Sequence, residues 1–118
     1  MDIGSLDFQQ ARIKQVVFKS RLRSVLYGVR EPDSSLFSVR ENPLGQWVSS
    51  TLAPRFGLAP EVRSLERVLQ QMLRHGQQLV DQYQRGQIED ARTGLEQIDA
   101  YAAEIDALLQ RLEQRPAA

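Results

Sequence analysis

Apolar and polar residues alternate with helical periods on both sides of a central interruption in the chain. Residues 7–27 predict a first long helix, because apolar or small residues recur there at alternating three- and four-residue steps. These residues are Phe8, Ala11, Phe18, Leu22 and Val25. A second apolar set, Ile13, Val16 and Val17, lies to the side of this stripe, so more than half of the circumference is apolar. Gly28 is expected to end this helix in a left-handed conformation.

Residues 29–58 form the interruption, which is richer in Pro, Ser, Asp and Asn. This composition predicts a turn-rich connection that contains one short helix. Asn42 can cap the free backbone N–H groups at the start of this helix, and Pro43 suits its first position. The short helix is expected to end at Pro54. Its apolar residues are Leu44, Trp47, Val48 and Leu52.

Two further long helices follow, over about residues 60–85 and 87–113. Gly86 should end the first of them, and His75 lies on its apolar face. The last helix has a heptad stripe throughout, which Tyr101 and Leu108 widen. The stripe consists of Ile88, Ala91, Leu95, Ile98, Ala102, Ile105, Leu109 and Leu112.

The pattern therefore predicts an all-α fold, a four-helix bundle of three long helices and one short helix within an irregular connection. We expect a single domain over residues 1–118, with its core in about residues 7–114. Because the first and last helices carry apolar residues beyond one stripe, a homodimer that buries the surplus is favoured over a monomer.

Composition and charge narrow the possible functions. The 118 residues contain no cysteine, which excludes disulfides, thiol nucleophiles and thiolate metal sites. Fifteen basic and fifteen acidic side chains give a net charge of zero, so we expect no nucleic-acid partner. The first eight residues have neither a positive region nor an apolar run, and we expect a cytoplasmic protein without membrane insertion.

Motifs of catalysis are missing from the sequence, which contains no Gly-rich phosphate loop, nucleophile elbow or HExxH pair. The single histidine, His75, is more than one helical turn from the nearest acidic residues, Glu66 and Asp81. We therefore expect a protein that is not an enzyme.

Three polar residues occupy positions that the periodicity predicts to be buried. Gln15 lies on the stripe of the first helix, while Gln71 and His75 are four residues apart and project from the same side of the third. Buried polar groups need hydrogen-bond partners, so we expect these side chains to bond to one another, to the backbone or to water. Two interpretations are equally open: a polar network that fixes helix register, or the remnant of a lost functional site.

The order of motifs resembles the chemoreceptor zinc-binding (CZB) domain family over nearly the whole chain. Three family motifs, His-x-x-Trp-Lys, Cys-x-Leu-Gly-x-Trp and His-x-x-x-His, match in order, followed by a glycine and an alanine-containing helix. The matching segments are Gln15-Val16-Val17-Phe18-Lys19, Asn42-Pro43-Leu44-Gly45-Gln46-Trp47, Gln71-Met72-Leu73-Arg74-His75 and Gly86-Gln87-Ile88-Glu89-Asp90-Ala91.

The resemblance implies where a zinc site would lie and that this chain has lost it. The family binds zinc through three histidines and one cysteine, whose positions here hold Gln15, Asn42, Gln71 and His75. Amides are weak, neutral donors, so we expect no metal and no other cofactor. The capping role of Asn42 explains that residue equally well.

The family occurs in cytoplasmic chemoreceptors and diguanylate cyclases, which act in chemotaxis and cyclic di-GMP signalling. The resemblance therefore implies a noncatalytic bacterial signal-transduction module that works by homodimerisation or by binding a chemoreceptor or diguanylate cyclase. The alternative is a small-ligand or residual metal sensor that uses the polar pocket at the former zinc site.

Overall fold

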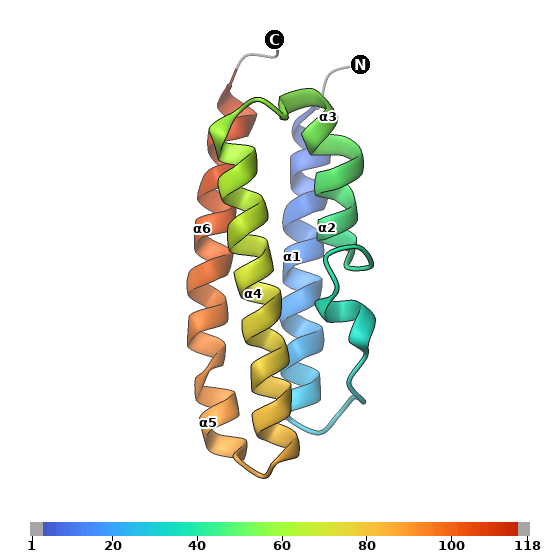
Figure 1. Cartoon of the computed structure of the whole chain (residues 1–118), viewed down its shortest axis with the longest axis vertical. Helices are drawn as coiled ribbons and strands as arrows, with labels where there is room; N and C mark the ends of the chain where they lie inside the picture. Colours follow the sequence, from blue (N-terminus) through green and yellow to red (C-terminus); the bar gives the residue numbers. More distant parts are fainter. Residues whose placement is uncertain (1–3, 116–118) are drawn as a thin grey trace.

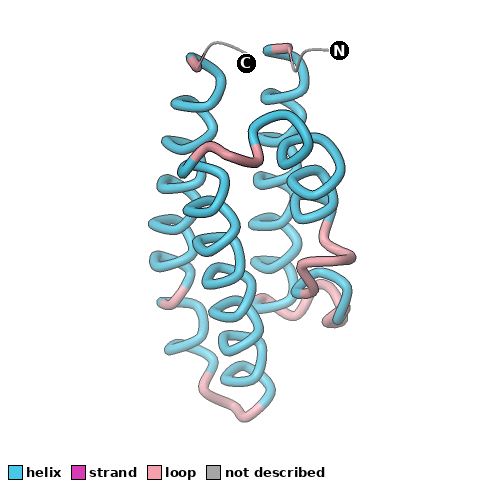
Figure 2. The backbone as a smooth tube through the Cα atoms, turned by 45° about the horizontal axis from the view of Figure 1, so that its top comes forward, coloured by secondary structure: helices cyan, strands magenta, loops and turns pink. Residues whose placement is uncertain are grey.

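Four helical columns make up the structure, a computed structural model that describes residues 4–115. Figure 1 shows them running alternately down and up along the long axis, with the third and fourth columns joined by a tight turn. The molecule measures 50 × 20 × 19 Å along its principal axes. The tube in Figure 2 contains helices and loops but no strand within the described residues. The predicted all-α class is confirmed, and the arrangement is bundle-like.

The first column is helix α1 (Ser5–Leu26), close to the predicted range 7–27. Its predicted stripe is buried, from Phe8 to Val25. The helix ends as expected, since Gly28 has a φ of 75° and its N–H donates to the carbonyl of Val25.

The second column climbs beside α1 from the irregular connection. It consists of a 3₁₀ turn, η1 (Ser34–Phe37), the short helix α2 (Pro43–Trp47), a π-helical turn, η2 (Val48–Leu52), and one further helical turn, α3 (Ala53–Phe56). The prediction that Pro54 ends the helix is wrong. Pro54 lies in the first turn of α3, directly after the π-helical turn, and the helical backbone continues through it.

The contact between α2 and the preceding loop requires a glycine. A Cβ atom at Gly45 would collide with the carbonyl oxygen of Val39, which is backbone and cannot swing away. The next turn brings Trp47 against Phe8 of α1, with ring centroids 5.8 Å apart in an edge-to-face arrangement. Trp47 is buried, so it fills the core between the first two columns.

The third column, α4 (Pro60–Gln84), packs against α1, η1, α5 and α6. It matches the predicted range 60–85 and ends before Gly86, which has a φ of 86°. In the middle of α4, Gly76 gives room to the ring of Phe37, whose nearest atom is 3.0 Å from where a Cβ would lie. Phe37 in turn packs edge-to-face on Phe18.

The fourth column is broken where the sequence predicted one continuous helix. Helix α5 (Ile88–Thr93) and helix α6 (Leu95–Gln114) are separated at Gly94. A Cβ at residue 94 would meet the side chain of Leu79, so Gly94 lets this column pack closely on α4 at the break. Arg92 of α5 donates to the carbonyl of Leu26 at 2.9 Å, which joins this column to the end of α1.

The apolar residues that widen the stripe of α6, Tyr101 and Leu108, pack against other parts of the same chain. Leu108 is buried, and Tyr101 packs edge-to-face against His75 of α4 at 6.1 Å between ring centroids. The apolar set on the flank of α1 remains exposed. The expectation that both helices offer a surplus is therefore right for α1 and wrong for α6. Ile88 of α5, which the stripe predicted to be buried, is exposed.

We expect the Gly45→Ala variant to be less stable by about 1–3 kcal/mol, because its Cβ forces α2 away from the Val39 backbone. Gln46→Ala is the matched control, since Gln46 is the exposed neighbour on the same helix and should change stability by no more than about 0.5 kcal/mol. Urea unfolding followed by circular dichroism measures both. Equal stability of the two variants would contradict the close approach.

Candidate functional site

Asn42 is almost fully buried, with 1% of its surface exposed, and all of its polar atoms have partners. Its Oδ1 accepts from the backbone N–H groups of Leu44 at 2.9 Å and Gly45 at 3.4 Å, which caps α2. Its Nδ2 donates to the carbonyl of Leu36 at 2.8 Å. The predicted capping role is confirmed, and the same side chain also holds η1 against α2.

Gln15 points inward as predicted, with 3% exposure. Its Nε2 donates to the carbonyl of Ala102 at 3.1 Å and to Oδ1 of Asp106 at 2.8 Å, so it connects α1 to α6. Its Oε1 is buried and has no partner in the described part of the chain. Gln15 is therefore a half-satisfied contact between helices.

The other two polar positions differ from each other, although they lie on the same helix. His75 is half-buried against Tyr101, and its Nε2 is buried without a hydrogen-bond partner among residues 4–115. Gln71 is exposed, so the expectation that it points inward is wrong. The buried face of α4 passes through the adjacent Met72 instead.

The four positions do not fit a zinc ion. Both polar atoms of Asn42 are occupied by backbone groups, Gln71 faces outward, and Gln15 offers one amide oxygen, which leaves the imidazole of His75 as the single good donor. Within the described residues, no group of three or more His, Cys, Asp or Glu side chains is placed to hold a metal ion.

Helix α1 also carries an exposed apolar surface, which we call the α1 strip. It consists of Ile13, Val16 and Val17, with exposed fractions of 61%, 63% and 38%. The sequence placed these residues beside the core stripe, and the structure leaves them partly exposed at the surface of α1, between its contacts with α2 and α6. Contiguous apolar residues on a surface are typical of contact sites for other proteins.

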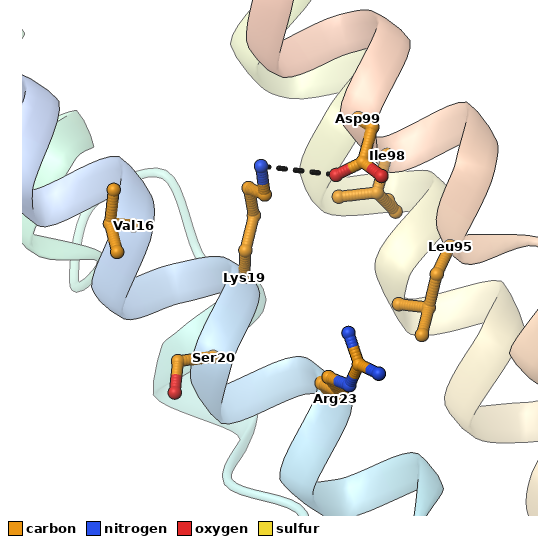
Figure 3. Close-up of a pocket in the computed structure, with 7 residues that line it drawn as sticks. All are labelled: Val16, Lys19, Ser20, Arg23, Leu95, Ile98 and Asp99. Atoms are coloured by element: carbon orange, nitrogen blue, oxygen red, sulfur yellow. Dashed lines mark ion pairs between the residues drawn. The ribbon is translucent and has the colours of Figure 1, made fainter.

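The α1 strip lies between two grooves. The α1–α6 groove, of about 280 Å³, contains Val16, Ser20 and the charged pair Lys19 and Asp99. Figure 3 shows Lys19 reaching across to Asp99 of α6, at 3.0 Å, while Arg23 extends from the next turn of α1. This groove is bridged by an ion pair and is mixed in character.

The second groove, the α1–α2 groove, has about 190 Å³ and is almost entirely apolar. It lies between α1 and the segment from η1 to the start of α2. Its lining residues are Ile13, Lys14, Val17, Phe18, Arg21, Leu36, Asn42 and Pro43. The sequence could not reveal this groove, because Leu36 and Pro43 meet α1 only after the connection folds back.

Basic side chains border the α1 strip on both sides. Toward α6, Arg12 pairs with Glu113 at 2.9 Å and Lys19 pairs with Asp99. Toward α2, Lys14 has no ion-pair partner among residues 4–115. Arg21 lies near Asp33, whose pKa is lowered mainly by hydrogen bonds from the backbone and hydroxyl of Ser35 and to a smaller extent by Arg21.

Comparison of the chain with models of protein families, with curated proteins and with solved structures finds no match. The CZB resemblance therefore stays a proposal that rests on the quoted motifs. Within residues 4–115, no helix has both the length and the apolar character needed to cross a bilayer.

We expect Asn42→Ala to lower the free energy of unfolding by about 1–2 kcal/mol through loss of the cap, and further because the Leu36 carbonyl loses its donor. Asn42→Ser keeps a capping oxygen but cannot reach Leu36, so its loss should be smaller. Urea unfolding ranks the three proteins. An alanine variant as stable as the wild type would contradict the structural role of Asn42.

We expect Gln15→Leu to change stability by less than about 1 kcal/mol, because it removes two hydrogen bonds together with an unpaired buried oxygen. Gln15→Glu should be destabilising at pH 7, since it places a carboxylate beside Asp106 and the Ala102 carbonyl. These neighbours and burial raise the pKa of the new carboxyl above its usual value, so the variant should regain stability as pH falls and the group takes up its proton. Unfolding curves at pH 7 and pH 5 test this, and a penalty independent of pH would contradict it.

Proposed function

We propose that this protein is a noncatalytic regulatory module of bacterial signalling, a CZB-like four-helix bundle without zinc that acts through contacts of its helices with other helices. The observation that carries this proposal is the α1 strip, an uncovered apolar surface on a long helix. The partner is a second copy of the chain or a chemoreceptor or diguanylate cyclase, the proteins that the motif resemblance implies.

The energetics of the α1 strip support an association site. Complete transfer of a valine or isoleucine side chain out of water contributes roughly 1.5–3 kcal/mol. Because 38–63% of the surface of these three residues is exposed, their burial supplies about half of that value each, which is part of a micromolar interaction. They occupy one side of a helix whose opposite side is anchored in the core by Phe8, Phe18 and Leu22. A rigid helix reduces the entropy lost when a partner binds.

The same surface explains why we expect regulation and not catalysis. The residues around the α1 strip are mainly apolar or basic, with Ser20, Asp99 and Asn42 among them, and the described residues show no hydrogen-bonded set of nucleophile, base and orienting group there. His75 is half-buried against Tyr101 on another part of the bundle. Binding is therefore the activity for which this arrangement of side chains is suited.

The double variant Ile13→Asp/Val16→Asp should abolish association, because it places two charges on the α1 strip. Sedimentation at micromolar concentration measures self-association, and pull-down with candidate chemoreceptors and cyclases measures partner binding. Ala100→Asp, on the exposed face of α6, is the control and should bind like the wild type. Both variants should stay folded and lose no more than about 1–2 kcal/mol, since the three positions are mostly exposed and the main cost is the lower helix propensity of Asp. A wild-type chain that stays monomeric and captures no candidate would contradict the proposal.

A second candidate function is a small-ligand or residual metal sensor, which Gln15 Oε1 and His75 Nε2 favour, since both are buried without a hydrogen-bond partner among residues 4–115. Elemental analysis of protein purified without added metal tests the metal form of this candidate. We expect zinc far below one equivalent per chain, because the donor set is one imidazole and three amides. Near-stoichiometric zinc would overturn the metal-free module and support the sensor.

A further inference from the structure

The α1–α2 groove combines an apolar floor with two basic residues of α1 in its lining. Its floor is formed by Ile13, Val17, Phe18, Leu36 and Pro43. Lys14 and Arg21 also line it, and they belong to the same helix as the first three of these residues. An apolar trough bordered by cations selects partners that carry apolar and acidic groups together.

The spacing of the two cations defines the partner further. Lys14 and Arg21 are seven residues apart on α1, which is two helical turns or about 10.5 Å. Two carboxylates at positions i and i+7 of a helix lying along α1 have this same separation. Apolar side chains at i+3 and i+4 of that helix would then point into the trough.

We propose that the α1–α2 groove binds an acidic amphipathic helix of a signalling partner, with apolar anchors on the groove floor and carboxylates on Lys14 and Arg21. This inference rests on the proposed function and names the chemistry of the partner. Lys14 supports it, since it has no ion-pair partner in the described part of the chain.

A second copy of the chain suits the groove less well. The exposed face of α6 is acidic, but it presents the small residues Ala100, Ala103 and Ala107 where the groove needs large apolar anchors. Packing α1 against α1 of another copy would bring basic residues of both helices together. The charge and shape of the groove therefore favour a partner of different sequence.

The α1–α6 groove provides an internal comparison. Lys19 there is already paired with Asp99, at 3.0 Å, so an acidic partner would have to displace a carboxylate of the chain itself. The cations Lys19 and Arg23 lie on the same helix as Lys14 and Arg21 but line the other groove. Reversing either pair of charges changes the net charge of the protein equally.

The experiment uses the full chain and a fluorescent alanine-based helical peptide with Glu at i and i+7 and Leu at i+3 and i+4. Fluorescence anisotropy should show saturable binding to the wild type that weakens with salt. Lys14→Glu/Arg21→Glu and Val17→Asp should each weaken binding by tenfold or more. The controls Lys19→Glu/Arg23→Glu and Ser20→Asp, which line the other groove, should bind within about twofold of the wild type.

Exchanging the charges of peptide and protein tests directly whether the carboxylates contact Lys14 and Arg21. A peptide with Lys in place of both Glu residues should fail to bind the wild type but bind Lys14→Glu/Arg21→Glu. Absence of binding to the wild type, equal losses in both pairs of variants, or failure of the swap would overturn the inference. If the peptide fails while candidate partners still bind through the α1 strip, the proposed function stands and the groove assignment falls.

Sedimentation of the same variants tests the occupant. Wild type and Lys14→Glu/Arg21→Glu should show the same self-association, because the groove takes a different protein. Loss of self-association in this variant, with the Lys19→Glu/Arg23→Glu control unaffected, would assign the groove to a second copy and overturn the partner named here.

Discussion

The hydrogen bonds of Asn42 are the interaction on which the arrangement of the second column beside α1 depends. One amide caps α2 through its oxygen and holds the Leu36 carbonyl through its nitrogen, while Gly45 lets the same turn approach the Val39 backbone. These contacts turn an irregular connection into a column that stands beside α1. Without them, Leu36 and Pro43 would not face α1, and the α1–α2 groove would lose one of its sides.

Local signals predicted most of the fold. The stripes of α1 and α4 and the glycines that end them depend on periodicity and on the left-handed conformation, which neighbouring residues alone determine. The end of the short helix at Pro54 and the continuity of the last helix were predicted wrongly, because both depend on the surrounding structure. A π-helical turn precedes Pro54, and the Leu79 side chain of α4 takes the space beside Gly94.

The sequence predicted the burial of some candidate site residues but not of others, because only some of them depend on local patterns. Gln15 and Asn42 lie at positions that a stripe and a cap define, and both are buried as expected. Gln71 sits at the edge of a broad apolar face, where exposure depends on how α4 is rotated against its neighbours. Periodicity also could not show that Leu108 of α6 is buried within the chain while Ile13 and Val16 of α1 remain exposed.

The segment from η1 to the start of α2, which forms one side of the α1–α2 groove, is held by fewer contacts than the long helices. In the segment that connects α1 to α2, residues 27–42, Leu36 is the one buried apolar residue, and Phe37 is partly buried against the core. The Leu36 carbonyl accepts a hydrogen bond from the amide nitrogen of Asn42. Such a segment can open as a local unit while the three long helices stay packed. The proposed binding surface therefore joins a rigid face on α1 to a less strongly held segment, which would accommodate apolar anchors of different size without disturbing the core.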